Sequence, residues 1–208
     1  MTVIRFLLRL LITGIAAIAA LATVPALAIP ITYYAQLGGL AEDPPNASPG
    51  VGNAVVVFDD DADTLRVRVS FSGLVGPVTV AHIHCCTASP GRGLASVATQ
   101  MPTFSGFPAG VTAGDYDATF DLTNPASYRA GFITASGGTV TAAEAALGDG
   151  LAAGRAYLNI HTSAFTGGEI RGFLVPEPAS LALFGVALLA LAMLRRRALQ
   201  RTVRLSAR

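Results

Sequence analysis

The chain has 208 residues, of which 52% are hydrophobic and 13% are charged, a balance too apolar for a disordered protein. All 14 basic residues are arginines, and eight of them lie at the two ends of the chain. Residues 29–178 hold 13 acidic residues against six arginines, a net charge of −7, which argues against nucleic-acid binding. The two cysteines are too few for a disulfide framework.

The N-terminus has the three parts of a secretory signal peptide. Arg5 and Arg9 form a positive region, residues 10–22 an apolar region, and residues 26–28 (ALA) a small-residue cleavage site. We predict a signal helix over residues 1–28 that is cut after Ala28, with Ala26 as the second choice. A retained membrane anchor is the alternative.

Residues 29–175 are predicted to form one exported, all-β domain. Short apolar or alternating runs separated by Gly, Pro, Asn and Asp are typical of antiparallel strands in a sandwich or barrel. In residues 65–71 the apolar side chains share one face, and Arg66, Arg68 and Ser70 take the other. We expect strands over residues 31–37, 53–58, 65–71, 78–84, 94–99, 116–122, 156–161 and 169–175. Thr141 and Glu144 resemble a capping box and predict one short helix from Ala142 to about Ala153.

An acidic stretch, residues 59–63 (DDDAD), joins two of these strands. Asp59, Asp61 and Asp63 resemble the start of a calcium loop. However, Thr64 replaces the required glycine and Ser70 the final glutamate. We interpret the stretch as a hairpin turn, with a calcium site as the alternative.

All three histidines lie on two predicted strands. His82 and His84 are two residues apart, so they point to one face, and His161 shares a face with Tyr157 and Asn159. Together the two strands could bring three imidazoles to one Zn or Cu ion. The alternative, which we favour, is that these side chains hold loop backbones in place, with no cofactor.

Cys85 and Cys86 follow His84 directly. Export to an oxidising compartment favours an oxidised form of these cysteines, and a disulfide between the two neighbours ranks first. Adjacent Cα atoms are only about 3.8 Å apart across a trans peptide, which is below the usual disulfide range of about 4.4–6.8 Å. An intermolecular bond and a thiolate that assists the histidines remain open.

Two further pairs of side chains have a structural and a functional interpretation. Phe104 and Phe107, in a Pro/Gly-rich loop, could cover the sandwich edge or offer an aromatic platform to a sugar or polymer. Glu169 and Arg171 share a strand face and could pair with each other or clamp Glu42, and the simplest interpretation is a partly solvated ion pair.

The C-terminus combines Pro176-Glu177-Pro178, an apolar run over residues 180–194 and a basic tail over residues 195–208 that begins with Arg195, Arg196 and Arg197. A helix of 15 residues covers about 23 Å, short for a hydrocarbon core near 30 Å. We nevertheless predict a transmembrane helix with the arginines on the cytoplasmic side, because such a basic end disfavours the alternative of a buried helix. This three-part tail resembles the PEP-CTERM sorting signal of bacterial exported proteins. The resemblance implies processing by an exosortase-type enzyme at the inner membrane and delivery to the cell surface or extracellular matrix.

The exported segment resembles the CHRD domain, first described in chordin. The resemblance rests on residues 40–45 (LAEDPP) with Gly50 and Gly52, residues 81–84 (AHIH), Gly91 and Gly93, residues 157–162 (YLNIHT) and residues 167–172 (GGEIRG). It implies an immunoglobulin-like β-sandwich that acts by binding.

The favoured function is therefore a non-catalytic surface or matrix protein whose partners include extracellular polysaccharide or a surface protein. The alternative is a metal-binding or redox protein that uses the three histidines. We expect no enzyme, because no nucleophile elbow or paired catalytic motif supports a hydrolase.

Overall fold

The computed structural model describes residues 30–177 and Leu188. The predicted signal helix therefore lies outside the described residues, as do the basic tail and, apart from Leu188, the predicted membrane helix. Within the described part of the chain, no helix is both long and apolar enough to cross a bilayer.

The described chain consists mainly of antiparallel strands, as the sequence predicts. The strands are β1 (Ile31–Gly38), β2 (Val51–Asp59), β3 (Thr64–Ser72), β4 (Val78–His84), β5 (Gly114–Asp121), β6 (Tyr157–Thr162), β7 (Ile170–Phe173) and β8 (Val175–Pro176). The helices are α2 (Ala130–Ala135) and α3 (Val140–Ala152), with the short 3₁₀ turns η1 (Gly39–Ala41) and η2 (Pro125–Ser127).

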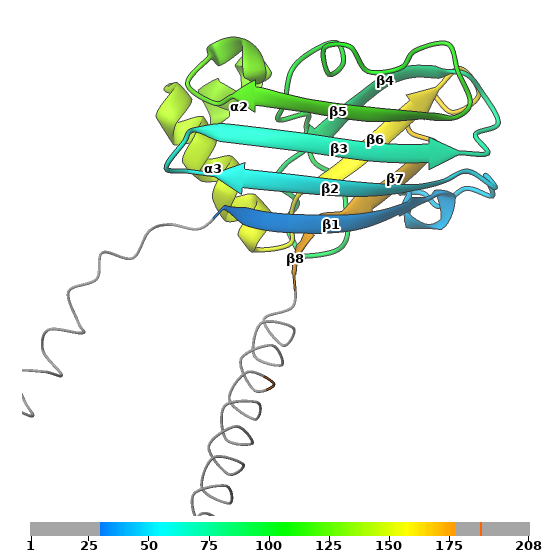
Figure 1. Cartoon of the computed structure of the whole chain (residues 1–208), viewed down its shortest axis with the longest axis horizontal. Coiled ribbons are helices and arrows are strands. Elements are labelled where there is room, and N and C mark those ends of the chain that lie inside the picture. Colours follow the sequence, from blue (N-terminus) through cyan, green and yellow to red (C-terminus); the bar gives the residue numbers. More distant parts are fainter. Residues whose placement is uncertain (1–29, 178–187, 189–208) are drawn as a thin grey trace, which may run out of the picture.

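Hydrogen bonds join all the strands into one sheet in the order β4-β6-β7-β1-β2-β3-β5, with every pair antiparallel. The sheet curls at β1 and β7, so that β4, β6 and β7 cross behind β2, β3 and β5 (Figure 1). β8 pairs with the start of β1 through Tyr33 and Tyr34, and Glu177 donates its N–H to the Thr32 carbonyl at 3.2 Å. Residues 175–177 are thus bonded to the first strand.

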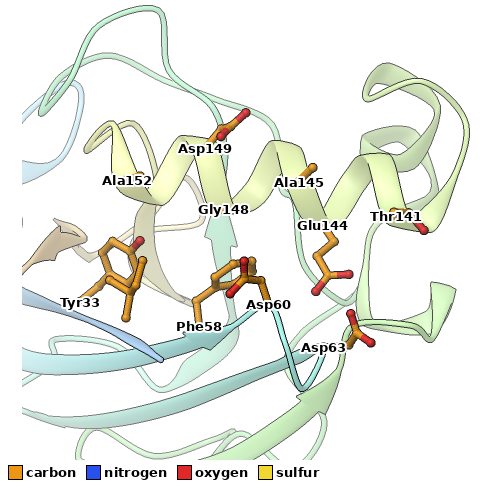
Figure 2. A pocket seen from close by; sticks show the side chains of 11 residues that line it. Tyr33, Phe58, Asp60, Asp63, Thr141, Glu144, Ala145, Gly148, Asp149 and Ala152 are labelled. Carbon is orange, nitrogen blue, oxygen red and sulfur yellow. The ribbon is translucent and has the colours of Figure 1, made fainter. Parts of the chain in front are cut away.

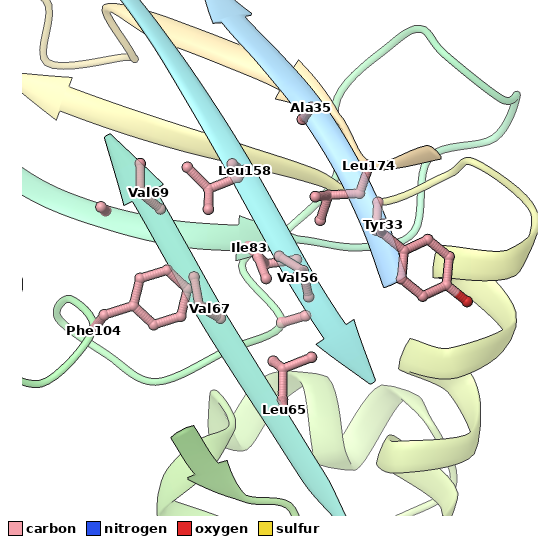
Figure 3. Packing of buried hydrophobic residues seen from close by; sticks show 14 of the residues in the cluster. Tyr33, Ala35, Val56, Leu65, Val67, Val69, Ile83, Phe104, Leu158 and Leu174 are labelled. Atoms are coloured by element: carbon pink, nitrogen blue, oxygen red, sulfur yellow. The ribbon is translucent and has the colours of Figure 1, made fainter. Parts of the chain in front are cut away.

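The hydrophobic core lies between the two halves of the curled sheet. In β3 the predicted alternation is confirmed, because Leu65, Val67, Val69 and Phe71 are buried whereas Arg66 and Arg68 are exposed. Val56 and Val67 from the front half meet Ile83 and Leu158 from the rear half (Figure 3). Each such side chain contributes about 1.5–3 kcal/mol through its burial.

Two details of the predicted elements are wrong. Residues 94–99 form no strand, because their pairing with the edge of β4 is limited to one isolated bridge between Val97 and His84, with bonds from Cys85 N to Ser96 O and from Ala98 N to Ile83 O. Residues 30–177 also contain two α-helices where we expected one. α3 begins two residues early, because the Thr139 hydroxyl accepts the N–H of Ala142 and so Thr139, not Thr141, is the N-cap.

Candidate functional site

The three histidines lie on the face of β4 and β6 that points away from the core. Ala81 and Ile83 of β4 face the core, so the alternating residues His82 and His84 face outward. The strand register pairs His82 with Asn159 and His84 with Tyr157. His161 is therefore the diagonal neighbour of His82, a separation that long side chains can bridge.

A long connection between β4 and β5 covers this face and binds two of the imidazoles. The Ala95 carbonyl accepts from His84 Nδ1 at 2.9 Å, and the Pro102 carbonyl accepts from His82 Nε2. The turn between β6 and β7 does the same for the third ring, since the Thr166 carbonyl accepts from His161 Nδ1 at 3.0 Å.

The three rings converge. Their centroids lie 5.5–6.0 Å apart, and one candidate ligand nitrogen from each ring lies within 4.8 Å of those of the other two. His82 and His84 are at most 9% exposed, and His161 is half-buried. Among the described residues, His82 Nδ1, His84 Nε2 and His161 Nε2 are buried and have no hydrogen-bond partner.

Burial keeps these rings neutral. Desolvation lowers the pKa of His82 and of His161, although a hydrogen bond to a backbone carbonyl raises each in part. The same desolvation lowers the pKa of His84 to about 4, and the nearby charge of Arg171 adds to the shift. A neutral imidazole is the form that binds a metal ion.

The sulfurs of Cys85 and Cys86 are bonded to each other as a vicinal disulfide. They pack against α3, where Cys86 Sγ lies 3.5 Å from the Ala146 carbonyl oxygen and a Cβ at Gly150 would overlap both sulfurs. Within the described chain the metal-ligating group comprises the three histidines and includes no cysteine.

Arg171 and Glu169 do not form the expected ion pair with each other. Arg171 is 3% exposed, its Nε lies 3.8 Å from the Glu42 carboxylate, and its guanidinium stacks 4.7 Å from the centroid of the Tyr157 ring. Burial raises the pKa of Glu42 to about 7, although Arg171 and Asn159 both act to lower it. Arg171 thus pairs with Glu42, which is one of the two alternatives left open by the sequence, and the pair is buried, not partly solvated.

Glu169 instead accepts four hydrogen bonds, from two connections of the sheet and from the last residue of β6. Ser48 Oγ and Val75 N donate to Oε1, each at 2.6 Å, while Thr162 Oγ1 at 2.6 Å and Gly76 N at 3.3 Å donate to Oε2. Burial alone would raise the pKa of this carboxyl, but these bonds outweigh it and lower the pKa. The sequence carries no signal for this anchor, because three of its four donors come from loops about 90–120 residues away along the chain.

The aromatic loop is part of the core. Phe104 is fully buried and Phe107 is 6% exposed, and both rings pack against Tyr116. The interpretation that they cover the sheet edge therefore holds, and neither ring is open to a polymer.

The acidic stretch forms the turn between β2 and β3, as we interpreted it. Asp59, Asp61 and Asp63 do not gather into a metal-ligating group in the described structure. Asp63 instead lines a cavity of about 470 Å³ under α3, together with Glu144 (Figure 2). Burial, followed by the negative charge of Asp63, raises the pKa of Glu144.

Comparison with known proteins agrees with both resemblances. The CHRD domain family model matches residues 33–174, so the chain belongs to the CHRD-domain family. The PEP-CTERM protein-sorting motif matches residues 174–197, which implies an exported protein that passes through a membrane-anchored precursor and an exosortase-type processing system. No curated protein and no solved structure matches the chain significantly.

Proposed function

We propose that this protein is a non-catalytic binding or structural protein that an exosortase-type enzyme releases from the inner membrane to the cell surface or extracellular matrix. One observation carries the proposal: a folded CHRD domain over residues 33–174 is followed at once by a sorting motif over residues 174–197. The proposal includes a cleaved signal helix before the domain and a transmembrane helix after it.

The bonding of the histidines gives no support to a catalytic triad. In the described chain, the bonded nitrogens of His82, His84 and His161 donate to backbone carbonyls and not to a carboxylate. A catalytic triad needs a histidine between a nucleophile and an acid, so this arrangement differs from one. The curled sheet, with its halves face to face, fits the immunoglobulin-like sandwich that we propose for the family.

Mutation of the sorting motif tests the proposal. Glu177→Ala should leave uncut precursor in the inner membrane, whereas Asp61→Ala, a matched change of an exposed carboxylate outside the motif, should be processed normally. Glu177 contributes its backbone N–H to β1, and alanine keeps that bond. Membrane fractionation and immunoblotting of the two variants give the answer, and normal surface delivery of Glu177→Ala would show that the motif is incidental.

The binding role needs its own test. The surface-exposed form should be retained by extracellular polysaccharide of the producing cells or by their surface protein fraction. If it is retained by neither, the domain does not act by binding these partners.

A further inference from the structure

We propose that His82, His84 and His161 together bind one imidazole-preferring divalent ion, Zn²⁺ or Cu²⁺. The proposal concerns a site in the folded domain and does not depend on how the protein is exported.

The hydrogen bonds decide which nitrogen of each ring is available. A carbonyl can only accept, so the nitrogen that faces Ala95, Pro102 or Thr166 must carry the ring proton. The second nitrogen of each neutral ring then has a free lone pair. Metal-binding histidines are oriented in this way, with the other N–H donated to a carbonyl or carboxylate.

The free nitrogens form a group that lacks a hydrogen donor. His82 Nδ1, His84 Nε2 and His161 Nε2 are all buried, and no donor among the described residues reaches them. Buried polar atoms are ordinarily satisfied, so three unpartnered acceptors in one cluster call for a ligand with positive charge. A metal ion would satisfy all three lone pairs at once.

The spacing lies close to that of a coordination sphere. One ligand nitrogen from each ring lies within 4.8 Å of the others. Three nitrogens held about 2.0–2.1 Å from a tetrahedral zinc ion would lie about 3.3 Å apart. Small rotations of the three imidazole side chains would close this difference. The covering loop and the turn hold each ring by its other nitrogen.

The donor set selects the class of ion. Imidazole nitrogens suit zinc and copper, whereas calcium and magnesium require oxygen ligands. Arg171 brings a positive charge near His84, and the Glu42 side chain 3.8 Å from Arg171 Nε offsets this charge only in the fraction that is ionised, because its pKa is about 7. Three protein ligands also leave one coordination position of a tetrahedral ion open to water or to an external ligand.

Metal titration of the purified full chain, stripped with a chelator and kept in mild detergent, tests the proposal. One equivalent of Zn²⁺ or Cu²⁺ should bind in competition with a chromogenic indicator and raise the melting temperature. Changes outside the ligands alone cost about 10–100-fold in affinity, so His161→Gln should weaken binding by more than about 100-fold. Thr166→Ala keeps the backbone carbonyl that orients His161 and should bind as the wild type does.

Copper EPR on the unmodified chain keeps the test independent of how the variants fold. Coupling to three nitrogens is expected, and a spectrum of oxygen ligation would overturn the proposal. It would also be overturned if the stripped chain takes up neither ion at micromolar concentration, or if folded His161→Gln binds as tightly as the wild type. In those cases the histidines only hold the loops, and export would be unaffected.

Discussion

The carboxylate of Glu169 is expected to be one of the strongest single anchors of the fold. Glu169→Gln keeps the size of the side chain but replaces one oxygen by an NH₂ group, which cannot accept hydrogen bonds. If the amide nitrogen takes the place of Oε2, the bonds from Thr162 Oγ1 and Gly76 N are lost. A hydrogen bond to a charged group contributes about 1.5–3 kcal/mol, so two bonds at the lower value amount to about 3 kcal/mol.

Urea unfolding of the full chain in mild detergent, followed by circular dichroism, measures this loss. A change of about 3 kcal/mol corresponds to a melting temperature lower by about 9 °C for a domain of this size. Asp115→Asn makes the same chemical change on an exposed strand residue and should lie within about 0.5 kcal/mol of the wild type. A Glu169→Gln variant as stable as Asp115→Asn would refute the assignment of these four bonds.

Two further predictions concern packing and pH. Gly150→Ala should destabilise the fold by about 1–3 kcal/mol, because its methyl group would overlap both sulfurs of the disulfide. Gly131→Ala in α2 meets only the Arg129 side chain, at an ordinary contact distance of 3.8 Å, and should stabilise the fold by up to about 1 kcal/mol. Similar unfolding free energies for both variants would contradict this. In metal-free protein, burial of neutral His84 contributes stability above pH 6.5 that is lost as the pH falls towards its pKa of about 4, a loss of about 3 kcal/mol. The His84→Gln variant should lose less stability over this range than the wild type. Comparison of the two proteins separates the effect of His84 from that of Glu42, whose raised pKa makes the fold more stable as the pH falls. If the unfolding free energies of the two proteins change in parallel with pH, the His84 contribution is excluded.

Periodicity predicted the strands well because one face of each packs on the core. β3 is the clearest case, with its alternation of apolar and polar side chains. Residues 94–99 were wrongly predicted to form a strand because their composition is similar to that of the observed strands. Their backbone bonds the edge of β4, and the Ala95 carbonyl accepts a hydrogen bond from His84. Hydrogen bonds made by backbone groups cannot be predicted from the hydropathy of the side chains.

Part of the histidine site could also be predicted. The spacing of His82 and His84 placed both on one face, but their distance from His161 depends on the register of β4 against β6. The orienting carbonyls of Ala95 and Pro102 come from an irregular loop, whose path local sequence does not determine. Sequence reasoning could therefore name the three histidines but not the backbone carbonyls that orient them.

The bond between Glu177 and Thr32 has a consequence for the precursor in the membrane. The predicted membrane helix starts at about residue 180, three positions after Glu177, and an extended chain covers at most about 3.6 Å per residue. The point where β8 joins the start of β1 would then lie within about 11 Å of the lipid, with almost no flexible linker between the domain and the membrane. A processing enzyme would have to reach the chain in the short space between the domain and the membrane, or act only after β8 dissociates from β1.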